Sequence, residues 1–196
     1  MSESPFAVRL VRALEDAPSV EPLTSLVAPL SRAVLRLPGS AVLRGGPAGH
    51  ALHPALTDLP IGAWTSASLL DLVGGRGART AARSLVAAGL LSAVPTALTG
   101  LAEWGHTDAR AGRVGAVHAA GNTAALALQA ASWLARRRGS HRTGAALSLV
   151  GAAVAGASAY LGGHLVTARN VASRDRAFAP SLPADAAPAL RSEMLT

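Results

Sequence analysis

Residues 49–60 read Gly49-His50-Ala51-Leu52-His53-Pro54-Ala55-Leu56-Thr57-Asp58-Leu59-Pro60. This stretch puts two histidines, an aspartate and two prolines at the start of an apolar segment that continues to Val73. Three later apolar segments each carry a histidine at or near one end. If the four segments run alternately up and down, those ends meet on one side, so the pattern predicts a helical bundle with a polar cluster at one end.

The composition favours closely packed membrane helices. Half of the 196 residues are hydrophobic, 15% are charged and the mean hydropathy is +0.34, whereas aromatic residues make up only 3%. The apolar residues are therefore mainly Ala, Leu, Val and Gly, which suit helices that approach one another through small side chains. A β-sandwich would need more β-branched and aromatic residues.

The charge pattern and the absence of cysteine exclude several classes of function. The net charge of +7 comes from arginine alone on the basic side, and the arginines flank the apolar segments. Because no nucleic-acid-binding motif or row of stacking aromatics accompanies them, no nucleic-acid partner is expected. The lack of cysteine excludes disulfides, thiolate-bound iron–sulfur clusters and c-type haem attachment.

The apolar segments are long enough to cross a bilayer. About 20 helical residues span its hydrocarbon core, and the links between segments are short, so consecutive helices should be antiparallel neighbours. We therefore expect an all-α fold, a transmembrane up-down four-helix bundle with N-terminal amphipathic helices, with the lipid bilayer as its first partner. The expected spans are 51–73, 84–101, 114–135 and 143–168.

Three regions follow from this pattern. Residues 1–47 should form amphipathic or interfacial helices, with Pro29 breaking the second of them into two pieces. Residues 48–170 should form the four-helix transmembrane domain, and 171–196 a disordered tail rich in Pro and Ala.

Each expected span carries one polar stripe, and such stripes should turn inward because lipid cannot satisfy polar groups. The stripes are Asp58, Gly62 and Thr65; Thr96, Thr99, Glu103 and His106; His118, Asn122 and Gln129; and Tyr160 and His164.

The candidate cofactor ligands are His53, His118 and His164, and Asp58 and Glu103 join them as candidate metal ligands. Two imidazoles at similar depth can clamp a haem b. Imidazoles combined with the two carboxylates would instead suit a Zn or Fe ion, or a proton relay. Hydrogen bonds between helices would account for the same side chains without any cofactor. Four glycines could leave room for a macrocycle: Gly115, Gly121, Gly162 and Gly163.

Four ordered motifs resemble the DUF2231 family of small bacterial four-helix membrane proteins. They are Leu52-His53-Pro54 with Asp58-Leu59-Pro60-Ile61-Gly62; Thr99-Gly100-Leu101-Ala102-Glu103-Trp104; Arg113-Val114-Gly115 with His118 and Asn122; and Tyr160-Leu161-Gly162-Gly163-His164-Leu165-Val166. The resemblance implies a multi-pass protein of the bacterial cytoplasmic (inner) membrane. Some members of that family are joined to Rieske-type iron–sulfur domains, which implies a redox neighbourhood. Any redox partner of this chain, Rieske-type or cytochrome, would be a separate protein.

Three hypotheses remain open from the sequence. The first is a membrane protein that binds haem b or a metal ion for electron transfer. The second is a structural membrane subunit or anchor without a cofactor, and the third is a metal-dependent membrane enzyme, for which no catalytic residue is assigned. An oligomer is compatible with all three.

Overall fold

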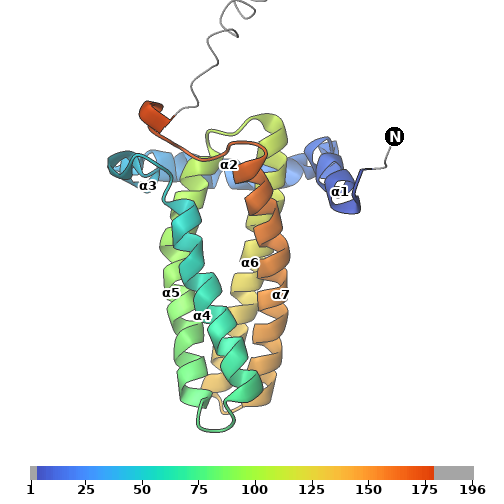
Figure 1. Ribbon diagram of the computed structural model, residues 1–196, viewed down its shortest axis with the longest axis vertical. Helices are drawn as coiled ribbons and strands as arrows, with labels where there is room; N and C mark the ends of the chain where they lie inside the picture. The colour runs from blue at the N-terminus through green and yellow to red at the C-terminus, as the bar shows by residue number, and fades with distance from the viewer. Residues whose placement is uncertain (1–3, 179–196) are drawn as a thin grey trace, which may run out of the picture.

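The computed structural model describes residues 4–178, and over this range it contains seven α-helices and no β-strand. The all-helical class is therefore confirmed. The helices are α1 (Phe6–Glu15), α2 (Glu21–Leu35), α3 (Ser40–Leu43), α4 (His53–Val73), α5 (Arg79–Trp104), α6 (Ala109–Arg137) and α7 (His141–Thr167), with the short 3-10 helices η1 (Pro18–Val20), η2 (Gly46–Ala48) and η3 (Arg176–Phe178). The four long helices lie side by side, and α1 to α3 gather at one end of them (Figure 1).

Local sequence signals fix the ends of the long helices. Pro54 occupies the first turn of α4, where its missing N–H costs no hydrogen bond. The side chain of Asp108 caps α6 by accepting a hydrogen bond of 2.8 Å from the N–H of Ala111. Gly139 adopts a left-handed φ of 83° just after α6, which allows the sharp turn into α7.

Three prolines remain inside helices, and a specific contact explains how α4 accommodates one of them. Pro60 cannot donate to the carbonyl of Leu56, and that carbonyl instead accepts a hydrogen bond of 3.1 Å from the hydroxyl of Thr96 on α5. The expected break at Pro29 is wrong, because α2 continues through it. The carbonyl that Pro29 frees belongs to Ser25, which is exposed, so no buried group loses its partner.

The four long helices are arranged as two hairpins. Helix α4 packs against α5, and α6 against α7, far more extensively than the hairpins pack against each other. Since α5 and α7 each border both α4 and α6, the helices α4 and α6 lie at diagonal corners. Among the described helices, α5 and α7 are long and apolar enough to cross a membrane.

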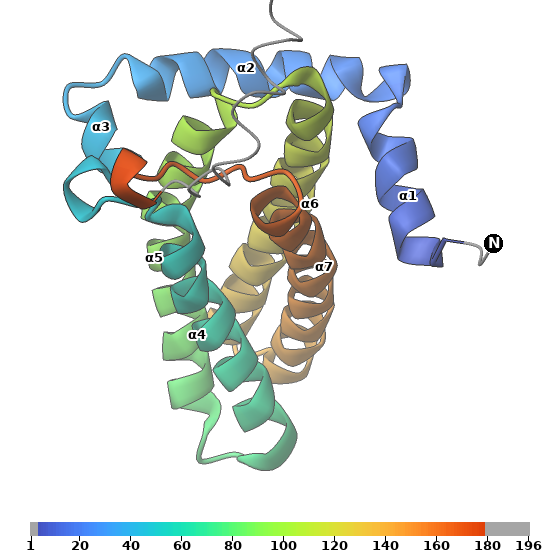
Figure 2. The ribbon, with the colours of Figure 1, turned by 45° about the horizontal axis from the view of Figure 1, so that its top comes forward.

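The N-terminal helices pack on the end of the bundle through one face and leave a second apolar face exposed. Helix α2 lies across that end (Figure 2) and buries Val27, Ser31 and Val34. The hydroxyl of Ser31 donates to the carbonyl of Leu101 on α5 at 2.8 Å. The exposed apolar side chains of this region include Phe6, Leu10, Leu26, Leu30 and Leu37.

The chain after α7 turns back over the same end. The N–H of Ala51 donates to the carbonyl of Ser173, and the N–H of Asp175 to the carbonyl of Gly49, both at 2.7 Å. Residues 171–178, which we expected to begin a disordered tail, therefore pack on the start of α4, because their backbone groups find partners there. The rest of the expected tail, 179–196, lies outside the described residues.

Candidate functional site

Two of the predicted ligands lie against each other between the hairpins, near one end of the bundle. The imidazole rings of His53 on α4 and His118 on α6 are 6.4 Å apart between centroids and nearly perpendicular, at 88°. Since α4 and α6 occupy diagonal corners, this contact crosses the bundle and joins the two hairpins. Residues 65 positions apart in the chain thus form one site.

Helix α5, which forms a hairpin with α4, contacts the ring of His53. The ring Nδ1 lies 2.9 Å from the carbonyl oxygen of Thr96 and 3.4 Å from the hydroxyl of Thr99. Gly100 lets the ring approach the helix, because a Cβ at this position would lie 2.7 Å from the ring Cε1. The absence of a side chain at Gly100 therefore sets how deeply His53 sits.

Helix α7 holds His118 in the same way. The ring Nδ1 lies 2.8 Å from the carbonyl oxygen of Ser158, and a Cβ on Gly162 would lie 2.8 Å from the ring Cε1. The Nε2 is 2.9 Å from the amide nitrogen of Asn122, one turn further along α6.

These contacts assign the same tautomer to both rings. A carbonyl oxygen can only accept a hydrogen bond, so Nδ1 of each imidazole carries the proton. The Nε2 atoms therefore carry the lone pairs. That of His118 accepts from Asn122, and that of His53 has no hydrogen-bond partner among residues 4–178. Nδ1 bonded to a carbonyl with Nε2 free is the usual arrangement of histidines that bind metals.

The two hairpins repeat one structural pattern beyond the histidines. The indole N–H of Trp64 on α4 donates to the carbonyl of Val86 and its ring packs on Gly89, while the amide of Gln129 on α6 donates to the carbonyl of Ser148 and packs on Gly151. The spacing is constant, because Gln129 follows Trp64 by the same 65 positions that separate the histidines. Thr96, Gly100, Val86 and Gly89 precede Ser158, Gly162, Ser148 and Gly151 by 62.

The same register places an ion pair toward the opposite end of the bundle. Asp71 on α4 and Arg136 on α6 are again 65 positions apart, and the two Nη atoms of Arg136 donate to the two carboxylate oxygens of Asp71. The side chain of Arg136 is fully buried and that of Asp71 is 8% exposed. Each pair, the histidines and these charges, thus joins equivalent positions of the two hairpins.

His164 is placed at the same end but has a different partner. Its Nε2 lies 2.8 Å from a carboxylate oxygen of Glu15 on α1. Two nitrogens of Arg169 donate to the two oxygens of the same carboxylate. The hydrogen bonds from Arg169, supported by His164, lower the pKa of Glu15 from 4.5 to about 2, although burial acts in the other direction. This cluster fixes α1 to the bundle. His164 therefore bonds Glu15 and is not part of the His53–His118 pair.

The two carboxylates predicted as metal ligands, Asp58 and Glu103, do not lie together. Glu103 is buried on α5 and bonds Ser173. Asp58 is exposed, as are Gly62 and Thr65, so the expectation that this stripe faces inward is wrong. The inward face of α4 carries His53, Trp64 and Asp71 instead, because the bulky indole of Trp64 fits against Gly89.

In the other three predicted polar stripes, some residues are buried as expected and others are exposed. Thr96, Thr99 and Gln129 are buried as expected, whereas His106, Asn122 and Tyr160 are exposed.

The described residues contain no group of three or more His, Asp or Glu side chains that could hold a metal ion. The glycines expected to leave room for a macrocycle are mostly packed. A Cβ on Gly115 would meet Trp104 and one on Gly121 would meet Ser158, while only Gly163 faces open space. Gly115, Gly121 and Gly162 therefore leave no open space for a macrocycle in this structure.

The two apolar helices of this all-helical fold favour a membrane protein, and the family comparison agrees with that class. The chain belongs to the DUF2231 family, described as a predicted membrane protein, whose family model matches residues 49–175. The match covers α4 to α7 and the returning segment, and so includes the His53–His118 pair. Comparisons with curated proteins and with solved structures gave no match.

Proposed function

We propose that this protein spans the membrane with all four long helices and binds one haem b between its hairpins, which His53 and His118 would hold. The 6.4 Å approach of the two rings across the bundle carries this proposal. In its bound state a b-type haem supplies a one-electron iron couple, so the function would be electron transfer with a separate redox protein.

The spacing of the rings suits a shared iron. Metal–imidazole bonds are about 2.0–2.1 Å long, and the centre of each ring lies roughly 1 Å beyond its nitrogen. Two imidazoles that hold one metal through Nε2 would therefore have centroids at most about 6 Å apart. The observed 6.4 Å is close to that value. Asn122 is exposed and can rotate away from the Nε2 of His118.

The number of ligands favours haem over a bare Zn or Fe ion. Protein-bound Zn typically needs three or four protein ligands, and the part of the chain that the structure describes offers no such group. Haem brings four equatorial nitrogens of its own, so two imidazoles complete it. Glu103 bonds Ser173, His164 bonds Glu15, and Asp58 faces outward, which leaves them outside this site.

The hairpin arrangement supports the proposal of four spans. Helices α5 and α7 are apolar enough to cross the bilayer, and α4 and α6 pack along them as antiparallel partners. Helix α4 has 21 residues, which corresponds to about 30 Å at 1.5 Å per residue. The amphipathic α1 and α2 would then lie at the membrane surface, where their exposed leucines meet lipid and their arginines meet headgroups.

A second candidate function is a structural membrane subunit without a cofactor. The hydrogen bonds from both rings to Thr96 and Ser158 favour it, since they also join helices.

One experiment separates the two functions. The protein is purified in mild detergent from cells supplied with haem precursor, and its visible spectrum is recorded oxidised and reduced, together with metal analysis. About one b-type haem per chain supports the proposal. A colourless protein supports the structural role, and stoichiometric Zn or Fe without a haem spectrum supports a metal site.

A further inference from the structure

The first helices of the chain pass around one end of the bundle. Helix α1 packs on α6, α2 packs on α6 and α5, and α3 packs on α5. In Figure 1, α1 lies on the right, α2 behind the bundle and α3 on the left, and Figure 2 shows the same path with this end turned forward. We call residues 6–44 the collar. It surrounds the end of the bundle at which α4 begins.

Helix α2 of the collar presents three different faces. An α-helix turns by about 100° per residue. The buried Val27 and Ser31 face the bundle, and the exposed Leu26 and Leu30 lie about a quarter turn to one side of them. The exposed Arg32 lies nearly opposite the two leucines. The apolar and the charged faces of α2 are therefore separate, and neither of them is the face that packs on the bundle.

The direction of each collar helix determines which way its apolar face points. Helix α2 runs from right to left behind the bundle in Figure 1. Because an α-helix is right-handed, the side of Leu26 and Leu30 faces the opposite end of the bundle, along the outer surface of α5 and α6. Helix α1 runs from front to back on the right, and the same construction puts Leu10 on this side as well. Arg12 and Arg32 lie on the other side of their helices.

The acidic side chains of the collar are neutralised within the protein. The collar contributes three of them, and each forms an ion pair with an arginine from the later part of the chain. The pairs are Glu15 with Arg169, Asp16 with Arg110, and Glu21 with Arg113. These contacts hold the collar against the bundle, and they leave no collar acid for the collar's own arginines.

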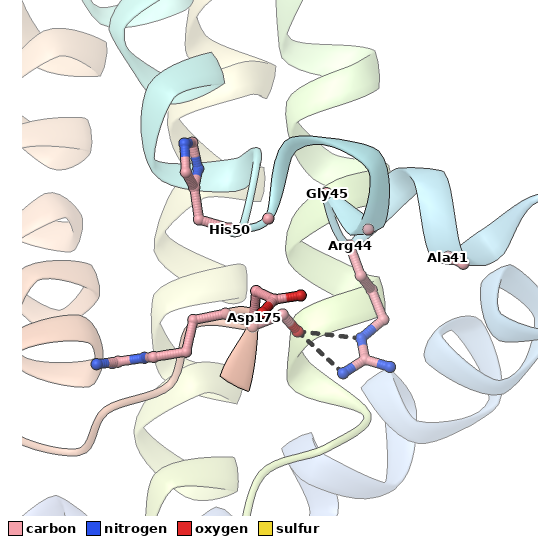
Figure 3. A pocket seen from close by; sticks show the side chains of 9 residues that line it. Ala41, Arg44, Gly45, His50 and Asp175 are labelled. Atoms are coloured by element: carbon pink, nitrogen blue, oxygen red, sulfur yellow. Dashed lines mark hydrogen bonds between the residues drawn. The ribbon is translucent and has the colours of Figure 1, made fainter. Parts of the chain in front are cut away.

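The arginines of the collar have no acidic partner among residues 4–178. Four of them are exposed, namely Arg9, Arg12, Arg32 and Arg36. The fifth, Arg44, lines a surface pocket of about 210 Å³ at the end of the collar (Figure 3), where its guanidinium bonds the hydroxyl of Ser173. Asp175 lines the same pocket without pairing with Arg44. The collar therefore presents unpaired positive charge above an apolar face, as helices bound to anionic membrane surfaces do.

We propose that the collar is a binding surface for anionic phospholipids. Leu10, Leu26 and Leu30 enter the outer part of the hydrocarbon layer, and the unpaired arginines contact the lipid phosphates. A second copy of the chain could cover the same leucines, but it would bring its own unpaired arginines to the contact, so charge favours lipid. This inference rests on the four membrane spans of the proposed function and is independent of haem.

The first test measures where the apolar face of α2 lies. Because the full chain has no cysteine, a fluorophore is attached to one introduced cysteine at a time, and the protein is reconstituted in vesicles of phosphatidylcholine and phosphatidylglycerol. The label at Leu26→Cys should be quenched by lipids brominated in their acyl chains and protected from aqueous iodide. The label at Ser25→Cys, an exposed position on another side of α2, should show the reverse.

A label on the long helices separates failure of this inference from failure of the proposed spans. Leu91 on α5 is 76% exposed, so Leu91→Cys should be quenched by the brominated chains. If Leu91→Cys is quenched but Leu26→Cys is open to iodide, the inference fails and the spans stand. Protection of Leu26→Cys from both quenchers would show a protein partner and also overturn the inference. If Leu91→Cys is not quenched by lipid, the spans and the inference fail together.

The second test measures the class of lipid at the collar. In wild-type background, brominated phosphatidylglycerol should quench the label at Leu26→Cys at least about twofold more efficiently than brominated phosphatidylcholine at the same mole fraction, and salt should reduce this preference. Replacing the four exposed arginines by glutamine should abolish it, with helix content checked by circular dichroism. Arg76→Gln with Arg138→Gln, at the other end of the bundle, should leave it unchanged. Equal quenching by both lipids, or a preference that survives the fourfold replacement, would overturn the proposal.

Discussion

Asp71 and Arg136 form a two-pronged ion pair between equivalent positions of the two hairpins, toward the end of the bundle opposite the histidines. Arg136 also bonds the hydroxyl of Ser132 at 3.1 Å and packs against Gly144 at the start of α7. Three residues on three helices therefore surround one guanidinium. The hairpins, which otherwise contact each other loosely, are joined by charge at this end and by imidazoles at the other.

Breaking this ion pair should destabilise the bundle strongly. Removing one partner of a buried pair leaves the other charge uncompensated and costs about 3–5 kcal/mol. We expect Asp71→Ala to lower the unfolding midpoint in detergent, measured by circular dichroism, and the double variant Asp71→Leu with Arg136→Leu to recover most of the loss. Arg137→Ala, at an exposed position, is the matched control. A single variant as stable as this control would show that the pair contributes little.

Two adjacent glycines on α7 should respond to alanine with opposite signs. A Cβ on Gly162 would lie 2.8 Å from the ring of His118, so Gly162→Ala should cost about 1–3 kcal/mol of folding free energy through overpacking. Gly163 has no atom within 4 Å of its position. Gly163→Ala should stabilise the helix by about 0.5–1 kcal/mol. Equal effects in chemical unfolding would contradict the packing described for His118.

The docking of α1 should depend on pH through Glu15. Because the folded protein lowers the pKa of Glu15 from 4.5 to about 2, its contribution to docking is complete above about pH 4.5. It is lost progressively as the pH falls toward 2, where the carboxylate becomes protonated in the docked state as well. The protection factors of residues 6–15, which correct for the intrinsic pH dependence of exchange, should therefore be high at neutral pH and fall below pH 4.5.

Replacement of the same carboxyl gives the control for that prediction. Glu15→Gln should make the exchange of α1 fast at every pH, since Arg169 and His164 lose their anionic partner. Asp16→Asn, which removes the exposed partner of Arg110, should change little. Equal protection of α1 in Glu15→Gln and wild type would mean that apolar packing of Val11 alone holds the helix.

The four-span topology can be tested directly because the chain has no native cysteine. Single cysteines replacing Arg76 and Arg138, in the links after α4 and α6, should react with an impermeant thiol reagent from one side of the membrane. A cysteine replacing His106, after α5, should react from the other side. Labelling of Arg76→Cys and His106→Cys from the same side would rule out a membrane-spanning α5.

Much of the fold could be predicted from the sequence. The apolar segments gave the four long helices to within a few residues at most ends, since hydropathy depends only on local composition. The short links gave their antiparallel order. The continuity of α2 could not be predicted, because the cost of Pro29 depends on whether the carbonyl it frees is exposed.

From the sequence, the position of the site along the bundle could be predicted, but not which side chains point into it. Sequence placed His53, His118 and His164 near one end, but the rotation of each helix is set by large side chains such as Trp64, whose partner Gly89 is on another helix. His164 contacts Glu15 only because α1 docks on the bundle, and the two residues are 149 positions apart in the chain. The recurrence of a 65-residue spacing was the available signal for the pairing of His53 with His118, and it is weak because few residues of the two hairpins are identical.

The most direct test of the central claim is the haem content of three single variants, His53→Ala, His118→Ala and His164→Ala, purified in parallel with the wild-type protein. The account predicts that the first two lose the b-type spectrum, and that His164→Ala keeps it at close to one haem per chain. Haem retained in both His53→Ala and His118→Ala, or lost only in His164→Ala, would contradict it.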